Sequence, residues 1–397
     1  MMSVWSSLVG QDAAVAKLSE AAASARAIVA SRGSGRATDE ARSMSHAWLI
    51  TGPPGSGRSV AARAFAAALQ CTGATPGCGQ CPGCRTTMGR TNADVLFAAT
   101  ETSIINVETA RSLVLQAQSS PSQGLWRVIV VEDADRLGES GANALLKAIE
   151  EPPEHTVWLL CAPSPEDMIA TIRSRCRHLG LRIPTATAVA DLLVREGIAT
   201  PEVALEAARA AQSHIGLARA LARDPQMRER RRSIITAPAS VRSVGEAVMA
   251  ADRLLETAKA QADAQVSDRN AREKADLLRQ LGMEEGESAT KASRTMLRQL
   301  EEDQKRRSKR ALTDAIDRAL IDLLAIYRDI LMVQVGGDGE LINTDLSELV
   351  HQIAHDSTPH QTLARVDHIE TARKRLVANG NPLLVLEDMA ISLRPQA

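Results

Sequence analysis

Aromatic residues are scarce in this sequence of 397 residues, at 2% of the chain. Any hydrophobic core must therefore be filled mainly by Ala, Leu, Val and Ile, a composition that favours helices. Hydrophobic residues still reach 44% of the chain, which excludes an intrinsically disordered protein. The length is sufficient for two or three domains with cores of their own.

The sequence also lacks a long apolar run and an excess of either charge. No run approaches the roughly 20 residues that a membrane-spanning helix needs. The N-terminus lacks the basic region followed by an apolar stretch that is typical of a signal peptide. We therefore expect a cytoplasmic protein with no membrane partner. The formal net charge of −1 excludes a molecule-wide basic field, so any nucleic acid must be held by a local feature.

Six cysteines in a chain expected to be cytoplasmic indicate metal binding or packing rather than disulfides. Four of them lie close together in a glycine-rich stretch, at Cys71, Cys78, Cys81 and Cys84. Four thiolates at this spacing are typical of a tetrahedral structural Zn²⁺ site, which leaves no position for a catalytic water. Reduced surface thiols are the alternative. Cys161 falls in a predicted buried strand, where packing is the expected role.

The centre of the sequence predicts two neighbouring parallel strands. Residues 128–131 form an apolar run, an acidic turn follows at 132–135, and a helix is expected over 142–151, where two prolines stop it. A second apolar run covers 157–161. Two such strands separated by one helix indicate an α/β fold with a parallel sheet. Carboxylates at the carboxyl end of such a strand lie where ligands bind.

A glycine loop follows another short apolar strand, at 47–50, and precedes a predicted helix. Strand, loop and helix together are the context that a phosphate-binding loop requires, and its glycines are Gly52, Gly55 and Gly57. Backbone N–H groups and the helix N-terminus favour an anion there. Arg58 stands where the pattern has lysine, and the planar guanidinium is not a conservative replacement. Ser59, the expected magnesium-side hydroxyl, is present. Phosphate binding and an empty glycine turn both remain open.

Most of the remaining chain predicts helices. Helices are expected over 12–30, 107–117, 312–335 and 382–393, and the pattern from 186 to 235 is helical with breaks near 197–201 and 213–216. Pro238 is expected in a linker. Residues 262–310 alternate charges with few large apolar residues, which predicts a solvated helical insertion. An exposed face and a partner surface are the two interpretations of that segment.

Together these motifs resemble an AAA+ clamp-loader subunit of bacterial DNA polymerase III. The features that carry the resemblance are Val9-Gly10-Gln11, the loop 52–59, the cysteine cluster, residues 143–147 with 150–153, and Ser174-Arg175-Cys176. Residues 216–221 resemble the second sensor segment of the family, with Arg219 at its arginine position. The resemblance implies a RecA-like α/β domain over 1–184 with a zinc module at about 71–84. It also implies a three-helix lid over 185–238 and a helical oligomerisation collar over 239–397, which contains the charged insertion.

The resemblance also implies a nucleotide site, which this sequence carries in degenerate form. Its residues would be Val9, Gly10, Gly52, Gly55, Gly57, Arg58, Ser59, Glu132, Asp133 and Arg219. Motor subunits of the family have lysine in the loop and Asp-Glu after the central strand, where the acids order Mg²⁺ and polarise the attacking water. Here the order is Glu132-Asp133, and a misplacement of about 1 Å can cost roughly a hundredfold in rate. The first sensor position falls at Ala162-Pro163, near Ser164. We therefore expect ATP and Mg²⁺ to be weakly bound or absent.

Arg175 is retained, and in the family this arginine stabilises charge on the nucleotide of a neighbouring subunit. A chain that loses its own hydrolysis but supplies this arginine resembles the delta-prime type. The implied partners are delta and gamma/tau subunits in a hetero-pentameric ring, the sliding clamp, and primed DNA through the assembled complex. Such a chain would belong to a DNA polymerase holoenzyme without being an independent ATPase. The alternatives are an active gamma/tau-type ATPase, a zinc-bearing scaffold with an empty loop, and, for Arg175, a structural ion pair.

Overall fold

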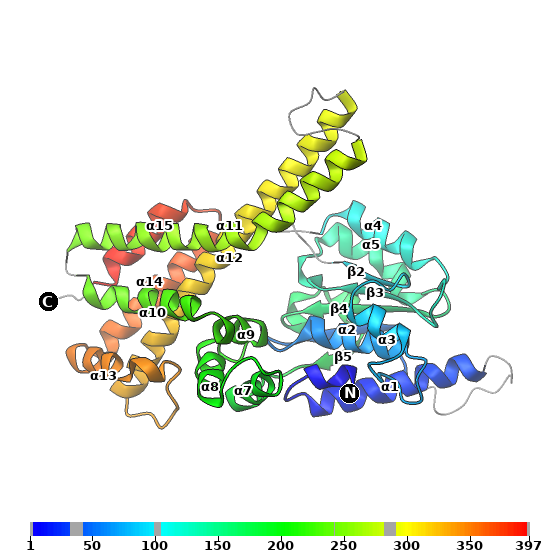
Figure 1. Cartoon of the computed structure of the whole chain (residues 1–397), viewed down its shortest axis with the longest axis horizontal. Helices are drawn as coiled ribbons and strands as arrows, with labels where there is room; N and C mark the ends of the chain where they lie inside the picture. The colour runs from blue at the N-terminus through cyan, green and yellow to red at the C-terminus, as the bar shows by residue number, and fades with distance from the viewer. Residues whose placement is uncertain (1–2, 32–42, 99–104, 242, 282–290, 395–397) are drawn as a thin grey trace. The chain divides into compact units, whose positions relative to one another are not determined.

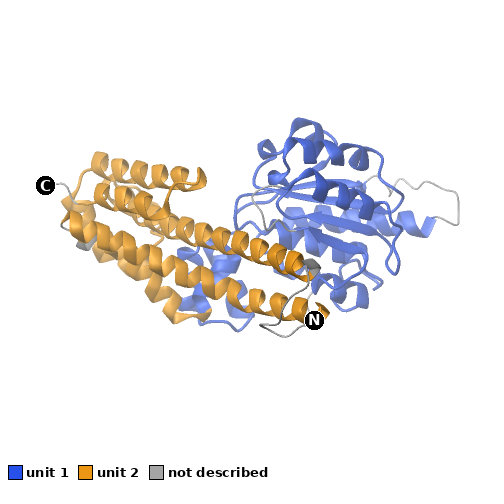
Figure 2. Cartoon of the chain, turned by 90° about the horizontal axis from the view of Figure 1, so that it is seen from above, with its two compact units in different colours: residues 1–222 blue, residues 223–397 orange. Residues whose placement is uncertain are grey.

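The computed structural model describes residues 3–31, 43–98, 105–241, 243–281 and 291–394. The chain divides into two compact units, Met1–Ala222 and Arg223–Ala397 (Figure 2). Unit 1 contains the sheet and the helices around it, and unit 2 is entirely helical in its described part. The predicted divisions at 184 and 238 stay predictions, because the two compact units set only one boundary, after Ala222.

Five parallel strands form the sheet of unit 1, in the order β2-β3-β4-β1-β5 (Figure 1). Their bounds are β1 (Ala47–Thr51), β2 (Val95–Ala98), β3 (Arg127–Val131), β4 (Thr156–Ala162) and β5 (Arg177–Gly180). The two central runs of the sequence are indeed parallel neighbours, with Val130 opposite Leu159. The predicted fold class is confirmed, namely an α/β domain with a parallel sheet followed by helical segments.

Helices pack on the two faces of this sheet and bury both. The helices of unit 1 before the last strand are α1 (Asp12–Ser31), α2 (Arg58–Leu69), α3 (Pro82–Met88), α4 (Val107–Ala117), α5 (Glu139–Glu150) and α6 (Ala170–Arg173). Alternate residues of a strand point to opposite faces. Val128 and Val130 therefore belong to the core with α1 and α2, whereas Ile129 and Val131 belong to the core with α4 and α5. Burial on both faces explains why these strands read as continuous apolar runs.

Alanine compensates for the scarcity of aromatic side chains in this core. Helix α2 buries six alanines together with Phe65 and Leu69. Small side chains let a helix approach a sheet closely. Close packing of the backbones therefore leaves less space for side chains to fill in this core. The few aromatic rings are concentrated here, and Trp48 packs edge-on against Phe65 at 5.2 Å between ring centroids.

Two buried polar side chains fix the chain before β3. Asp94 is fully buried and accepts hydrogen bonds from the backbone N–H groups of Ser122, Gln123 and Gly124 at 2.6–2.8 Å. Burial acts to raise the pKa of Asp94, but these hydrogen bonds outweigh it and hold the pKa below its usual value. Gln70, at the end of α2, accepts from the N–H of Leu125 at 3.0 Å and also binds the backbone of Trp126. The turn before β3 is thus tied to two distant elements.

Three helices complete unit 1 after the sheet, α7 (Ala186–Arg195), α8 (Pro201–Ala210) and α9 (Ile215–Arg223). The breaks between them fall where the sequence predicts. The expectation for Pro238 is wrong, because α10 (Pro225–Ser240) continues past it. Pro238 lies only two residues before the end of this helix, where the loss of one N–H donor disturbs little of the helix.

Unit 2 is built from α10 and five further helices, α11 (Val244–Leu281), α12 (Lys291–Gln334), α13 (Ser347–Asp356), α14 (Pro359–Val377) and α15 (Pro382–Ser392). Its core contains the apolar face of α12, including Ile316, Leu320 and Ile330, with Ile369 and Leu386 from the last two helices. None of the described helices of either unit combines the length and the apolarity needed to cross a membrane.

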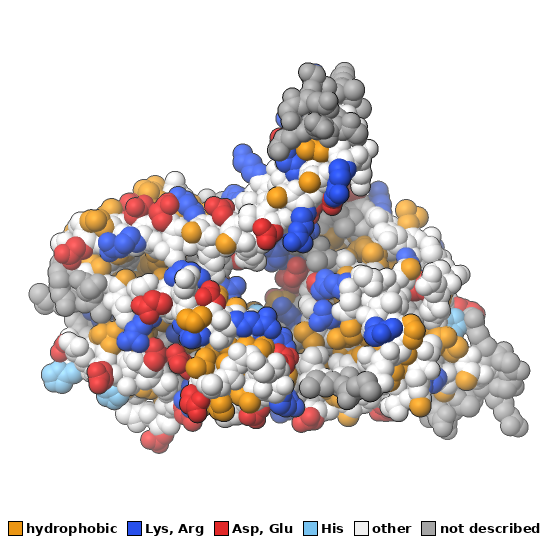
Figure 3. All heavy atoms as spheres, viewed as in Figure 1, with side chains coloured by type: hydrophobic (Ala, Val, Ile, Leu, Met, Phe, Trp, Pro, Cys, Tyr) orange, Lys and Arg blue, Asp and Glu red, His pale blue; other side chains and the backbone are white. Residues whose placement is uncertain are grey.

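The charged stretch 262–310 consists of the ends of α11 and α12 that face each other across residues 282–290, which lie outside the described residues. These two helix ends lie side by side as a hairpin (Figures 1 and 2). Ala262 and Val266 form a small buried cluster with Ala311, just beyond the stretch, and Arg307 donates to Asn270 and Glu273 of the opposite helix. Acidic and basic side chains are intermixed along the hairpin (Figure 3), as expected for a solvated helical pair.

Candidate functional site

The four clustered cysteines converge in space. Their sulfur atoms all lie within 4.8 Å of one another, although Cys71 follows α2 while Cys81 and Cys84 belong to the start of α3. Backbone N–H groups point at the sulfurs, with Cys81 N 3.4 Å from Cys78 Sγ and Cys84 N 3.4 Å from Cys81 Sγ. Such donors stabilise thiolates, the form in which cysteine binds metal.

The surroundings of these sulfurs fit a structural zinc ion. A Cβ atom on Gly73 would lie 2.8 Å from Cys78 Sγ, and one on Gly83 would lie 2.1 Å from the carbonyl oxygen of Gln70. Only glycine therefore permits this convergence. Burial raises the pKa of Cys84, whereas for Cys81 the effect of burial is outweighed by hydrogen bonds that lower its pKa to about 6. A soft, closed set of four sulfur ligands suits tetrahedral Zn²⁺, which would cross-link α2 to α3.

The N-terminus of the described chain braces the cysteine loop. Val4, in the short helix η1 (Val4–Ser7), donates its N–H to the carbonyl oxygen of Gly77 at 3.0 Å, and the Ser3 hydroxyl donates to the same oxygen at 2.9 Å. Gly77 has a φ of +82°, and a Cβ atom on it would lie 2.8 Å from Trp5 Nε1. Segments more than seventy residues apart thereby hold the module together.

Two glycines of the loop have left-handed backbone conformations, and Arg58 is turned back onto the loop. Gly55 and Gly57 have φ angles of +89° and +90°, and Gly57 directly precedes the first turn of α2. Arg58 Nη1 donates to the carbonyl oxygen of Gly52 at 2.9 Å. Ser59 lies half-buried in the first turn of α2. The guanidinium is therefore engaged by its own loop instead of extending as a lysine would.

The segment before α9 closes on this loop. A Cβ atom on Gly55 would lie 2.9 Å from the Cα atom of His214, so the backbone of His214 approaches the loop directly. His214 also caps α9, where its ring accepts from the N–H of Leu217 at 3.2 Å. This contact brings the three helices α7–α9 to the glycine loop within unit 1.

Val9-Gly10-Gln11 also reaches the loop. The Gln11 amide donates to the carbonyl oxygens of Arg182 at 2.5 Å and Ser56 at 3.3 Å, and it accepts from the N–H of Arg182. Gly10 has a φ of +68°. Val9 lines an open cavity of about 420 Å³ together with residues of α7, namely Ala188, Asp191, Val194 and Arg195. The predicted contact of this motif with the nucleotide region is thus geometrically possible.

The acid after β3 is already paired. Glu132 lies 2.5 Å from Arg90, measured from Oε1 to Nη2, and its side chain is 12% exposed. Arg90 follows helix α3, which carries Cys84, and also lies over the Phe97 ring at 4.9 Å from the centroid. The short helix η3 (Ala134–Arg136) begins directly after Asp133, whose carbonyl accepts from the N–H of Arg136. No sequence motif pointed to Arg90, which lies 42 residues from its partner.

The loop and the acidic turn flank the carboxyl end of β4. Burial raises the pKa of the Cys161 thiol in that strand to about 12, and the nearby charges of Arg58, Glu132 and Asp133 act on the same thiol. Cys161 is completely buried, as predicted for a packing residue. At the first sensor position, Pro163 accepts from the N–H of Gly52 at 3.1 Å, and the Ser164 hydroxyl caps the short helix η4 (Pro165–Asp167).

Arg219 forms a bidentate ion pair with Glu196, at 2.8 and 2.5 Å. Both residues belong to the three-helix segment, Arg219 on α9 and Glu196 at the end of α7. This pair and a hydrogen bond to Glu196 raise the pKa of Arg219. The predicted second-sensor arginine is thus held by its own segment in the isolated chain.

Arg175 lies at the surface, just after α6. Its side chain is 36% exposed, its Nε forms an ion pair with Glu150 at the end of α5, and its Nη1 donates to the carbonyl oxygen of Thr171 at 2.7 Å. Burial raises the pKa of the adjacent Cys176 to about 12, so this cysteine anchors the motif. An ion pair between two exposed side chains contributes little to stability. The Arg175 side chain therefore lies at the surface, and breaking its ion pair with Glu150 costs little free energy.

The match to a known protein family lies within unit 1. Residues 36–185 match the family described as DNA polymerase III, delta subunit. The DNA polymerase III subunit gamma/tau of Mycobacterium bovis is 35% identical over 162 residues, 39% of this chain and 28% of that protein. The delta' subunit of Pseudomonas aeruginosa is 34% identical over 165 residues, 41% of this chain and 50% of that protein. Part of this chain is therefore similar to clamp-loader AAA+ subunits of DNA polymerase III.

The clamp-loader resemblance inferred from the motifs is thereby confirmed at the level of the family. The aligned regions cover half or less of each of these relatives. Both gamma/tau and delta' subunits are among the relatives, so similarity alone does not separate the two types. That distinction has to come from the residues around the glycine loop.

Proposed function

We propose that this clamp-loader-type chain acts as a delta-prime subunit that does not hydrolyse ATP by itself. The observation that carries the proposal is the ion pair between Glu132 and Arg90. In the resemblance, an acid at this position serves Mg²⁺ or the attacking water, and a carboxylate neutralised by a guanidinium serves neither well. The engagement of Arg58 by the Gly52 carbonyl supports the same conclusion, because no lysine ammonium is present to reach the outer phosphates.

The proposal assigns the catalytic contribution of the chain to Arg175, which would act on the nucleotide of a neighbouring subunit. Its exposure and its weak pairing with Glu150 support this role, because the guanidinium can be transferred to a phosphate at little cost. Arginine suits the task, since its planar fork matches phosphoryl oxygens in a bidentate way. There it would stabilise charge that develops as the phosphoryl group transfers.

The assembly belongs to the same proposal. The chain would occupy one position in a hetero-pentameric ring with delta and gamma/tau subunits and help load the sliding clamp on primed DNA in the cytoplasm, as part of the DNA polymerase III holoenzyme. Contacts to DNA would be made to backbone phosphates, which carry no sequence information. Zinc would hold the module of residues 71–84 and take no part in catalysis.

The experiment is the substitution Arg175→Ala in the reconstituted loader. An arginine supplied in trans raises kcat about a thousandfold or more at the nucleotide site that it contacts. The loader's total ATP turnover should therefore fall by the fraction that the one site facing this chain contributes. Size-exclusion chromatography should show that the assembly is unchanged. Arg173→Ala is the matched control, because Arg173 is also exposed on α6 and makes one long contact, to the Pro165 carbonyl. Unchanged turnover by the assembled Arg175→Ala loader would rule out the assignment.

A gamma/tau-type motor is the second candidate, supported by the 35% identity to a gamma/tau subunit. Phosphate release by the purified chain alone separates the two. Brisk hydrolysis would favour the motor, whereas the delta-prime proposal expects release at the level of a no-protein control. A zinc-bearing scaffold with an empty loop, the third possibility, predicts no nucleotide binding and no effect of Arg175→Ala.

A further inference from the structure

Arg63 lies on α2, more than one turn beyond the glycine loop, and is an unusual residue in an alanine-rich buried helix. Within the described chain, its Nε atom is buried and has no hydrogen-bond partner. Burial lowers the pKa of Arg63, and the charges of Arg90 and Arg219 lower it further, while Glu132 acts in the opposite direction. A buried guanidinium N–H without a hydrogen-bond partner destabilises the folded protein, unless a ligand accepts its hydrogen bond.

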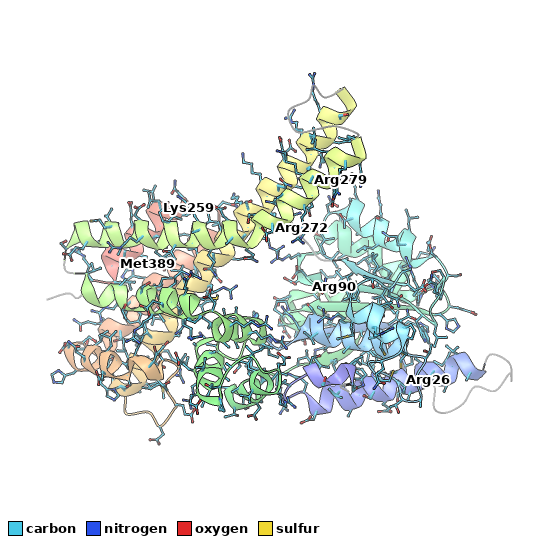
Figure 4. The ribbon with its side chains drawn as sticks, viewed as in Figure 1. Arg26, Arg90, Lys259, Arg272, Arg279 and Met389 are labelled. Atoms are coloured by element: carbon cyan, nitrogen blue, oxygen red, sulfur yellow. The ribbon has the colours of Figure 1, made fainter. Side chains whose placement is uncertain are left out.

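Arg90 reaches the same region from a different element. It has a φ of +58° just after α3, a backbone conformation that non-glycine residues rarely adopt, and its guanidinium is paired with Glu132. Figure 4 labels Arg90 among the side chains of unit 1. Its guanidinium carbon also lies 4.9 Å from the centroid of the Phe97 ring, a cation–π contact that helps to hold the side chain. Arg90 thus places a fixed positive charge at the carboxylate where the family's chemistry would place a metal.

The charges that act on Arg63 leave a positive surplus. Arg90 is paired with Glu132 and Arg219 with Glu196, whereas Arg63 has no such ion pair among the described residues. The charges of Arg58 and Asp133, which also lie near Glu132, are opposite and cancel. Mg²⁺ needs carboxylate oxygens that are free to coordinate it and is repelled by such a surplus. An anion, in contrast, is attracted by it and accepts the unused donors.

From this arrangement we propose that the site beside the glycine loop takes a polyphosphate anion without magnesium, with Arg63 and Arg90 providing the charge that a metal ion would otherwise supply. The inference rests on the proposed function, because it assumes a phosphate ligand at the degenerate loop. It adds that the binding is independent of divalent metal, which explains how a nucleotide could be held there without being turned over.

The test is calorimetric titration of the full-length, zinc-loaded chain with ATP and with inorganic tripolyphosphate. Each probe is measured in magnesium-free buffer and with millimolar Mg²⁺. No chelator is used, because chelation would strip the zinc. We expect the dissociation constant of each probe to be no better with Mg²⁺ than without it. Binding that requires Mg²⁺ would overturn the inference, and so would the absence of binding by both probes.

Three variants separate an anion site from a magnesium site. Arg63→Gln and Arg90→Ala should each weaken tripolyphosphate binding about tenfold, the value of one charge-assisted hydrogen bond. Glu132→Gln should strengthen it, because the competing negative charge is removed. A magnesium-organised site predicts the opposite for Glu132→Gln. Arg111→Ala, at an exposed arginine on α4, is the matched control and should leave binding unchanged.

Zinc content and tryptophan fluorescence check that each variant is folded. The outcome is separable from that of the proposed function, because the effect of Arg175→Ala is read in the assembled loader. Magnesium-dependent binding would overturn only the metal-independence argued here. Loss of the Arg175→Ala effect would overturn the role in trans while leaving the anion site in place.

Discussion

At the scale of single residues, the sequence shows which groups are altered, but it does not show what they contact. The replacement of lysine by Arg58 is visible in the loop, yet its contact with the Gly52 carbonyl is not. Glu132 was a candidate from its position after a buried strand, whereas Arg90 belonged to no motif. The reason is that a motif records local spacing, while an ion pair depends on where the chain returns in three dimensions.

Asp94 illustrates the same point for stability and yields a prediction. Asp94→Asn should destabilise unit 1 by about 3 kcal/mol at neutral pH, because the amide offers donors to N–H groups that need an acceptor. The folded pKa of Asp94 is depressed, so its contribution is present above the unfolded pKa of about 4 and is lost as pH falls through the folded value. The stability difference between wild type and variant should therefore shrink in acid.

Denaturant titrations followed by tryptophan fluorescence measure this difference, since Trp5, Trp48, Trp126 and Trp158, the four tryptophans of the chain, all lie in unit 1. Asp191→Asn, at an exposed aspartate on α7, serves as the control. A gap that stays constant from neutral to acidic pH would show that the charge of Asp94 is not what stabilises the turn.

At the scale of elements, hydrophobic periodicity predicted the helices reliably, whereas residues taken as helix boundaries, such as proline, were less reliable. The helix over 107–117 begins and ends where expected, because an N-cap asparagine precedes a clear amphipathic pattern. Pro238 was misjudged, since a proline near a helix end costs little. The charged stretch 262–310 continues two long helices whose apolar ends are packed in unit 2, so tertiary contacts at one end extend the helix at the other.

The zinc module is the element for which a clear test exists. Cys78→Ser should abolish stoichiometric zinc and lower the thermal midpoint of unit 1, because metal binding contributes to folding in such modules. The change should include the environment of Trp5, which lies against Gly77 of the cysteine loop. Zinc content by atomic absorption and thermal unfolding by fluorescence provide the measurement.

Cys161→Ala is the control, because Cys161 is buried in β4 outside the cluster. The Cys161→Ala variant should retain one zinc per chain, even if its thermal unfolding midpoint falls. Full zinc occupancy in the Cys78→Ser protein would contradict a four-cysteine site.

At the scale of the whole molecule, the chain consists of two compact units whose cores share no residues among those described. The core of unit 2 extends from Ile235 to Leu393 and includes Tyr327, the one tyrosine of the chain. A fragment of residues 223–397 should therefore fold by itself into a helical, cooperatively melting domain.

Tyr327 provides the measurement. Burial raises its pKa to about 12, compared with about 10 in an unfolded chain. In the isolated fragment at pH 11, the phenol should stay un-ionised until denaturant is added, as read by tyrosinate absorbance and compared with helical circular dichroism. Because the unfolded state ionises first, the fragment should also lose stability as pH rises above 10. Immediate ionisation at pH 11 in the absence of denaturant would mean that the fragment lacks this core.

The sequence alone determined the parallel strands, most of the helices, the cluster of four cysteines and the departure of the glycine loop from its usual pattern, because each of these depends on neighbouring residues and regular spacing. Only the tertiary structure decided that Arg90 pairs with Glu132, that Arg63 has a buried donor without a partner in the described part of the chain, and that Arg175 lies at the surface. These features depend on segments tens of residues apart being brought together by the packing of α2 and α3 on the sheet, and no local pattern encodes that distance.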